Sequence, residues 1–313
     1  MLSRQLQADL WLALVALIWG STFVVVKGEL EHIGPMAFVA LRFTFAFLIM
    51  VLLARRSLLR SSWRQVAAGL LIGVFLFGGY ALQTVGLRYT TASKAAFITG
   101  LSVVLAPLFA RLFLGQSAPR RAVVGVALAI LGLGLLSLSG DLTPEMGDLL
   151  VLGCAASFAL HIVAIARFAP VMDTMALTAI QIGVVAVGGV VSMVVMEPPT
   201  APPGPGSVLV AAAMGMVATA FAFSIQNRVQ AFTTPTHTAL VLSLEPVFGA
   251  LSAYLLAGER LGPRELLGCA LILAGVGAAE SGRDEGVDTV KAELATSAPA
   301  AGSGSRVTRW DDA

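Results

Sequence analysis

The feature that most constrains this chain is a repeated apolar stretch, which occupies residues 89–137 and again residues 232–280. The two copies align with a constant offset of 143 residues and without a gap. A repeat of this length predicts an architecture built from two copies of one structural unit. The corresponding pairs include Thr90 and Thr233, Leu101 and Leu244, Gly115 and Gly258, Arg121 and Arg264, and Gly132 and Gly275.

The composition indicates an integral membrane protein. Hydrophobic residues make up 57% of the chain and charged residues 12%, whereas a soluble domain has about 45–50% and about 25%. So much apolar surface requires contact with the lipid bilayer. The net charge of +2 gives no basic signal for a nucleic-acid partner. Cys154 and Cys269 both lie inside apolar runs, so we expect small core residues and no disulfide.

Windows of about 20 apolar residues, each long enough for one helical crossing, recur along the chain. We therefore predict an all-α integral membrane protein with ten transmembrane helices. An uncleaved first helix fits better than a signal peptide, because its apolar core is too long. The predicted spans are 10–26, 35–54, 65–86, 92–114, 121–138, 147–166, 174–196, 207–227, 235–257 and 262–280.

The spans form two sets of five, and five is an odd number. The second set must then begin on the opposite side of the membrane, so the two repeats are inverted. This geometry is typical of secondary transporters, whose substrate site lies between the repeats near the midplane. The predicted organisation is a cytoplasmic N-terminus (1–9), a first repeat (10–138), a connecting loop (139–146), a second repeat (147–280) and a disordered cytoplasmic tail (281–313).

Basic residues predict the orientation. Four arginines stand between the second and third spans, and further arginines stand in other even-numbered connections, whereas acidic residues gather on the opposite side. The positive-inside rule then places both termini in the cytoplasm of a cell whose inner (plasma) membrane holds the protein. The four arginines are Arg55, Arg56, Arg60 and Arg64.

Glu245 is the most unusual residue of the predicted membrane interior. It lies near the middle of the ninth span, where a charged side chain costs about 2.5–3.5 kcal/mol. His237 lies on the same helix face, and Pro246 follows directly and can free a backbone carbonyl. Glu245 either lines a cavity and binds a cation, a proton or a substrate amine, or it is structural, pairing with an arginine or capping a broken helix.

Arg42 lies too deep in the second span to reach the outer surface comfortably. It either captures a substrate carboxylate or forms a buried ion pair that holds helices together, with Glu245 as its candidate partner. Lys94 corresponds to His237 in the repeat. Lys94 either reaches the interface, or the two residues flank a gate or a substrate anion.

The other polar groups of the predicted spans are neutral. Each either forms a hydrogen bond between helices or lines a cavity. Trp19 is either an interfacial anchor or part of the cavity wall. The neutral polar candidates are Gln83, Thr99, His161, Gln181 and Gln226.

Three segments carry a resemblance to a known family. They are LWLALVALIWGSTFVVVK (10–27), ALRFTFAFLIM (40–50) and LSLEPVFGALSAYLLAGERL (242–261). With them, residues 8–280 resemble the EamA-type proteins of the drug/metabolite transporter superfamily. The resemblance implies ten helices, two repeats and a central cavity that opens to alternate sides, for export or import of small metabolites such as amino acids. The first repeat departs from the pattern, because Ser102 stands where the second repeat has Glu245.

A secondary transporter is therefore the leading hypothesis, with a small-molecule substrate and with Glu245 and His237 as the groups that would couple transport to protons. No HExxH, no phosphate-binding loop and no second midmembrane carboxylate supports an intramembrane enzyme, and we expect no cofactor and no metal. A sensor or structural membrane partner without transport is the alternative. The sequence leaves open the substrate, the direction of transport, the coupling ion and whether the protein is a monomer or a homodimer.

Overall fold

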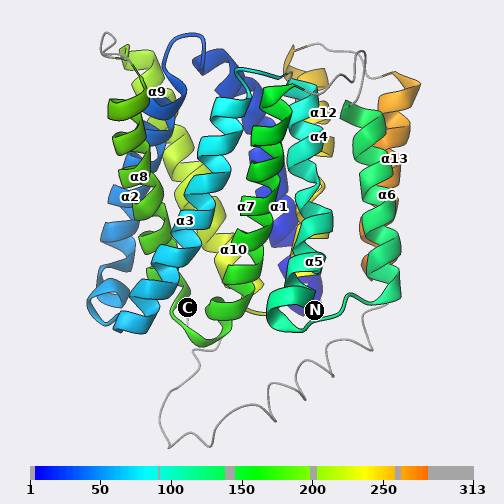
Figure 1. The fold of residues 1–313 in the computed structure, drawn as a ribbon, viewed down its shortest axis with the longest axis horizontal. Helices are drawn as coiled ribbons and strands as arrows, with labels where there is room; N and C mark the ends of the chain where they lie inside the picture. Colours follow the sequence, from blue (N-terminus) through cyan, green and yellow to red (C-terminus); the bar gives the residue numbers. More distant parts are fainter. Residues whose placement is uncertain (1–3, 91, 138–144, 198–202, 258–261, 281–313) are drawn as a thin grey trace, which may run out of the picture.

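A computed structural model describes residues 4–90, 92–137, 145–197, 203–257 and 262–280 of the chain. Every regular element in these ranges is helical, and the helices stand side by side in one bundle (Figure 1). The elements are α1 (Arg4–Glu29), α2 (Pro35–Leu59), α3 (Trp63–Gly86), α4 (Ala92–Gly100), α5 (Ser102–Leu114), α6 (Arg120–Ser137), α7 (Met146–Phe168), the 3-10 turn η1 (Ala169–Val171), α8 (Thr174–Met196), α9 (Pro205–Met214), the π-helix η2 (Gly215–Phe221), α10 (Ala222–Gln230), α11 (Pro235–Leu242), α12 (Glu245–Ala257) and α13 (Pro263–Glu280).

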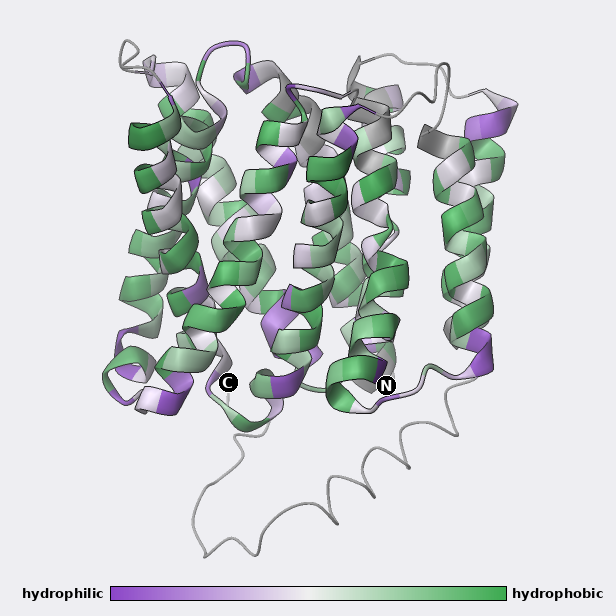
Figure 2. Ribbon diagram, in the orientation of Figure 1, coloured by the Kyte–Doolittle hydropathy of each residue, from purple (hydrophilic) through white to green (hydrophobic). Residues whose placement is uncertain are grey.

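Six helices within the described residues are long and apolar enough to cross a membrane, which makes this a multi-pass membrane protein. Hydrophobic residues cover most of the length of the bundle, and hydrophilic ones gather at its two ends (Figure 2). Many large apolar side chains also point outward, which suits contact with lipid. The six spans are Pro35–Leu59, Trp63–Gly86, Phe97–Leu114, Met146–Val171, Thr174–Met196 and Pro205–Gln230, and Leu6–Thr22 is a shorter apolar helix.

The predicted fourth and ninth spans are each interrupted. α4 ends at Gly100 and α5 begins at Ser102, whereas α11 ends at Leu242 and α12 begins at Glu245. Pro246 is the second residue of α12, a position where the missing N–H of proline costs no helical hydrogen bond. The two interruptions lie at corresponding positions of the sequence repeat.

Glycines bring the helices into close contact. A Cβ atom on Gly132 of α6 would lie 2.5 Å from the carbonyl oxygen of Gly268 in α13. A Cβ atom on Gly275 of α13 would lie 2.6 Å from the carbonyl oxygen of Gly125 in α6. The two contacts are reciprocal, and only glycine allows backbones this close.

The packed core lies in two main clusters. One fills the space between α1, α6, α11 and α13, with Leu12, Leu133, Leu240 and Ile272 all fully buried. The other fills the space between α2, α3, α8 and α10, and its members include Phe43, Met50, Leu76, Ile182 and Phe223.

The predicted connecting loop lies mostly outside the described residues, and the predicted tail lies wholly outside them. Glu197 follows the last residue of α8, at the start of the connection to α9. The Glu197 carboxylate accepts hydrogen bonds from the backbone N–H groups of Met36 (2.6 Å) and Ala37 (3.1 Å). It thereby satisfies two free donors in the first turn of α2 and ties the end of α8 to the start of α2.

Candidate functional site

The π-helix η2 offers a backbone carbonyl to two polar side chains. Because a π-helical turn bonds residue i to residue i+5, it displaces the backbone from the regular α-helical pattern. The carbonyl oxygen of Ala218 accepts hydrogen bonds from Trp19 Nε1 (2.8 Å) and from Arg42 Nη2 (3.2 Å). Arg42 Nε donates in addition to Thr219 Oγ1 (2.8 Å). Trp19 of α1 and Arg42 of α2 are thus both hydrogen-bonded to η2.

Aromatic rings surround the other side of Arg42. Its guanidinium carbon lies 5.4 Å from the ring centroid of Tyr80 and 5.6 Å from that of Phe43. The Tyr80 ring in turn makes an edge contact with Phe158, at 5.5 Å between centroids. Such cation–π contacts stabilise a desolvated guanidinium by about 2 kcal/mol. Arg42 is buried, with 6% of its surface exposed. Among the described residues, no carboxylate forms an ion pair with it.

The rings continue toward α7 and α8. The Phe223 ring lies 5.1 Å from the Trp19 ring and 5.8 Å from the His161 ring. His161 Nε2 and Gln181 Oε1 are 2.7 Å apart and share a hydrogen bond. The sequence predicts Trp19, His161 and Gln181 as candidates. In the structure Trp19 and His161 both contact Phe223, and Gln181 contacts His161.

Glu245 begins α12 directly after the interruption. α1 approaches this point closely, because a Cβ atom on Gly20 would lie 2.4 Å from the Glu245 carbonyl oxygen and 2.8 Å from the Gly249 nitrogen. No ion pair within 4.0 Å and no side-chain hydrogen bond of Glu245 is found in the described part of the chain. Its carboxyl group lies within electrostatic range of Arg42, Tyr80 and Cys154.

These contacts bear on the two alternatives for Arg42 and Glu245. The two side chains are close enough to interact through space, yet the guanidinium donates to η2 and not to the carboxylate. Two opposite charges that lie near each other without direct contact can both contact a third group.

Further polar groups lie next to this region. Gln83 Nε2 donates to Thr99 Oγ1 (3.2 Å), and Thr99 Oγ1 lies 3.9 Å from Cys154 Sγ, which joins α3, α4 and α7. Two buried amide atoms, Gln181 Nε2 and Gln226 Oε1, have no hydrogen-bond partner among the described residues. A buried polar atom without a hydrogen bond lowers the stability of the fold by about 1–3 kcal/mol, so a water molecule or a ligand that bonded to either atom would remove this cost.

We name these groups the central belt. It combines a buried cation, a carboxylate, aromatic rings and unpaired amide atoms. In the described residues, no group of three His, Cys, Asp or Glu side chains could hold a metal ion. The belt consists of Trp19, Arg42, Tyr80, Gln83, Thr99, Cys154, Phe158, His161, Gln181, Phe223, Gln226 and Glu245.

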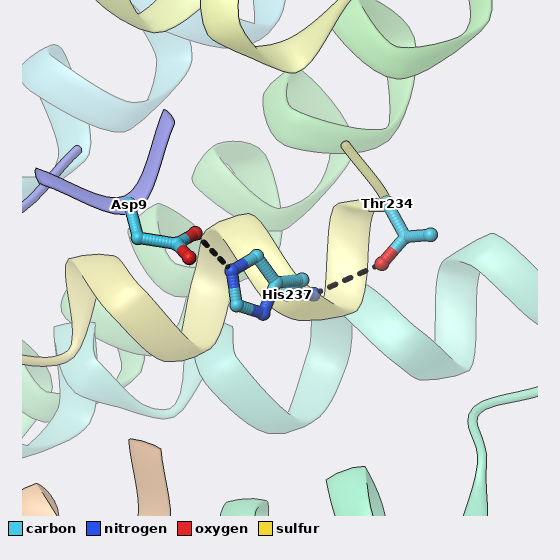
Figure 3. A network of polar contacts seen from close by, with 3 residues as sticks. All are labelled: Asp9, Thr234 and His237. Carbon is cyan, nitrogen blue, oxygen red and sulfur yellow. Dashed lines mark hydrogen bonds and ion pairs between the residues drawn. The ribbon is translucent and has the colours of Figure 1, made fainter. Parts of the chain in front are cut away.

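His237 lies elsewhere, near the start of α11. Its Nε2 atom is 2.6 Å from Oδ1 of Asp9 in α1, and both side chains are buried (Figure 3). Its backbone N–H donates to Thr234 Oγ1 (3.3 Å). At the other end of the bundle, the Thr90 hydroxyl donates a hydrogen bond to Asp148 at the start of α7. The side chain of Lys94, the predicted counterpart of His237, lies outside the described residues.

Sequence reasoning missed two kinds of residue. The rings of Tyr80, Phe158 and Phe223 stand in apolar runs where aromatic residues carry no signal of their own. Asp9 was placed in the N-terminal segment because the apolar window begins at residue 10. α1 begins at Arg4, so Asp9 lies inside the helix.

A family model for the EamA-like transporter family matches the chain twice, over residues 6–138 and 145–279. An uncharacterized transporter of Archaeoglobus fulgidus is 37% identical over 277 residues, which cover 87% of this chain and 85% of the relative. A probable amino-acid metabolite efflux pump of Salmonella typhimurium is 26% identical over 84% of this chain and 91% of its own.

One solved crystal structure has the same fold. It superposes with a TM-score of 0.75 at 21% identity and covers 88% of this chain and 97% of its own chain. The family match spans nearly all the described helices, and the relatives are named as transporters. The chain belongs to the EamA-like transporter family and is a membrane transporter.

Proposed function

We propose that the chain crosses the membrane ten times as two inverted five-helix repeats. The two family matches and the offset of 143 residues divide the chain in the same way. The reciprocal contacts of Gly132 with Gly268 and of Gly275 with Gly125 support a two-fold relation, because exchanging the two repeats turns one contact into the other. The interrupted helix pairs α4–α5 and α11–α12 also occupy corresponding positions.

Both termini face the cytoplasm in this proposal, and the membrane is the inner (plasma) membrane. The support is Arg55 and Arg56 near the end of α2, Arg60 in the turn and Arg64 at the start of α3, which are all exposed. Figure 1 shows the start of α1 at the same end as the turn between α2 and α3.

We infer that the protein is a secondary transporter that moves small zwitterionic metabolites, such as amino acids or related compounds, by alternating access. The observation that carries this proposal is the central belt, in which Arg42 and Glu245 lie near each other without an ion pair. Arg42 would bind a substrate carboxylate, and Glu245 would bind an amine or a proton. The Salmonella relative named as a probable amino-acid metabolite efflux pump supports this substrate class and favours export.

The contacts at the two ends of the bundle would control access to the belt. At one end, Asp9 and His237 join α1 to α11. At the other end, Thr90, which precedes α4, is joined to Asp148 in α7. Opening one end would require its contact to break while the other persists, which is the pattern of inverted repeats that rock around a central site.

Flux through proteoliposomes tests the function. Vesicles that contain the protein are expected to exchange at least one member of a panel of labelled amino acids faster than protein-free vesicles, and the recovered label should be chemically unchanged. Flux equal to that of protein-free vesicles for the whole panel would contradict the substrate class. Binding of a panel member without flux would support the alternative of a membrane sensor.

A further inference from the structure

An arginine-lined cavity lies at one end of the bundle, apart from the central belt. It opens between the turn that joins α2 to α3 and the start of α8, with a volume of about 130 Å³. Its lining residues are Arg56, Ser57, Arg60, Gln65 and Asp173.

The walls of this cavity are fixed by hydrogen bonds. Asp173 Oδ2 accepts from Ser57 Oγ (2.8 Å), and its carbonyl oxygen accepts from Gln65 Nε2 (2.9 Å). Asp173 Oδ1 accepts from the backbone N–H groups of Met175 and Ala176 and so caps α8. Both oxygens of the one lining carboxylate are thus engaged, and Gln65 is nearly fully buried.

The two arginines have no such partners. Arg56 and Arg60 are exposed, and in the described part of the chain neither forms an ion pair or a side-chain hydrogen bond. Arg55 near the end of α2 and Arg64 at the start of α3 add two further exposed arginines on either side of the turn. A planar guanidinium binds phosphate or carboxylate oxygens through two parallel hydrogen bonds, so these free donors suit an anionic ligand such as a phosphate group.

The surface of α2 next to the cavity indicates that the phosphate group belongs to a lipid. Leu48, Leu52 and Arg56 follow one another at intervals of four residues on one face of α2, and Arg60 directly follows the last residue of that helix. Leu48 and Leu52 are 56% and 73% exposed, so an apolar, outward-facing stripe runs directly into the two arginines. Trp63, at the start of α3, is 75% exposed, as expected for an aromatic residue at the membrane–water interface.

We propose that this cavity binds the headgroup of an anionic phospholipid, with Arg56 and Arg60 on the phosphate and the acyl chains along Leu48 and Leu52. Basic pockets between transmembrane helices bind anionic headgroups by the same physics. The site would tie the α2–α3 turn and the start of α8 to the membrane surface. The proposal does not depend on what the central belt transports.

Lipid binding by the purified full-length protein tests the proposal. Native mass spectrometry in detergent would measure the retention of added phosphatidylglycerol, with phosphatidylcholine and inorganic phosphate as comparisons. The wild type is expected to retain phosphatidylglycerol, and the double variant Arg56→Gln/Arg60→Gln to bind it more weakly by on the order of tenfold. The control Arg111→Gln/Arg120→Gln, which removes two exposed arginines outside the cavity, should bind as the wild type does.

Three results would overturn the proposal. Unchanged phosphatidylglycerol retention in the Arg56→Gln/Arg60→Gln variant would show that the cavity does not hold the headgroup. Equal retention of phosphatidylcholine would show that apolar contact alone holds the lipid. Displacement of the lipid by millimolar inorganic phosphate would assign the cavity to a small anion. Thermal unfolding without lipid, expected to be the same for all variants, checks that the protein remains folded.

Discussion

Replacing Glu245 with glutamine is expected to reduce substrate flux at least about tenfold, which corresponds to about 1.4 kcal/mol of lost interaction. Glutamine keeps the size of the side chain and removes its charge, so the change isolates electrostatics. The carboxyl group interacts through space with Arg42 and has no side-chain hydrogen bond among the described residues. The folded structure should therefore tolerate Glu245→Gln, while a substrate amine or a proton loses its partner. Flux and thermal unfolding, measured on the same preparation, separate the two effects.

Glu31→Gln is the matched control for this prediction. Glu31 is exposed, between α1 and α2 and outside the central belt, so its neutral variant should transport as the wild type does. Unreduced flux in Glu245→Gln would show that the carboxylate is structural. A lower unfolding temperature in Glu245→Gln, together with the lost flux, would point to the same conclusion.

Gly20→Ala is expected to have the largest effect on stability. A methyl group at this position would lie 2.4 Å from the Glu245 carbonyl oxygen and 2.8 Å from the Gly249 nitrogen, and both of these atoms belong to the backbone. Backbone atoms cannot swing away as a side chain does, so α1 must shift from α12. Overpacking of this kind costs about 1–3 kcal/mol. Chemical unfolding in detergent should show the loss, and substrate flux should fall with it, because α1 also carries Trp19.

Gly28→Ala provides the control on the same helix. A Cβ atom on Gly28 would meet nothing within 4 Å, and alanine is a better helix former than glycine by about 0.8–1.0 kcal/mol. Gly28→Ala should therefore be as stable as the wild type or slightly more stable. Equal stabilities of the Gly20→Ala and Gly28→Ala proteins would mean that α1 and α12 are not packed as described.

The apolar windows predicted most of the helices, because lipid exposure makes a whole helix apolar and leaves a clear length signal. The predicted span 174–196 coincides with α8, and 35–54 falls within α2. The interruptions and the π-helix could not be predicted in this way. α4 and α5 together read as one apolar window, and Gly215–Phe221 looks like ordinary helix until its hydrogen bonds are seen.

The candidate site was predicted in part for the same physical reason. Polar groups such as Arg42, His161 and Gln181 stand out in an apolar run, because each needs a partner there. Which partner each one finds depends on the packing of distant helices. The sequence suggested Glu245 for Arg42, whereas the closest contacts of the guanidinium are the carbonyl of Ala218 and the hydroxyl of Thr219.

Side-specific labelling of the central belt tests alternating access most directly. Thr99→Cys, in a protein whose Cys154 and Cys269 are replaced by alanine, places one thiol in the belt. A small membrane-impermeant thiol reagent is then applied to one side of proteoliposomes or to the other. We expect reaction from both sides, protection by a transported amino acid, and faster reaction in the Asp9→Asn variant from the side on which Asp9 lies. Reaction from only one side, or from neither, would contradict a central site that opens alternately to the two faces of the membrane.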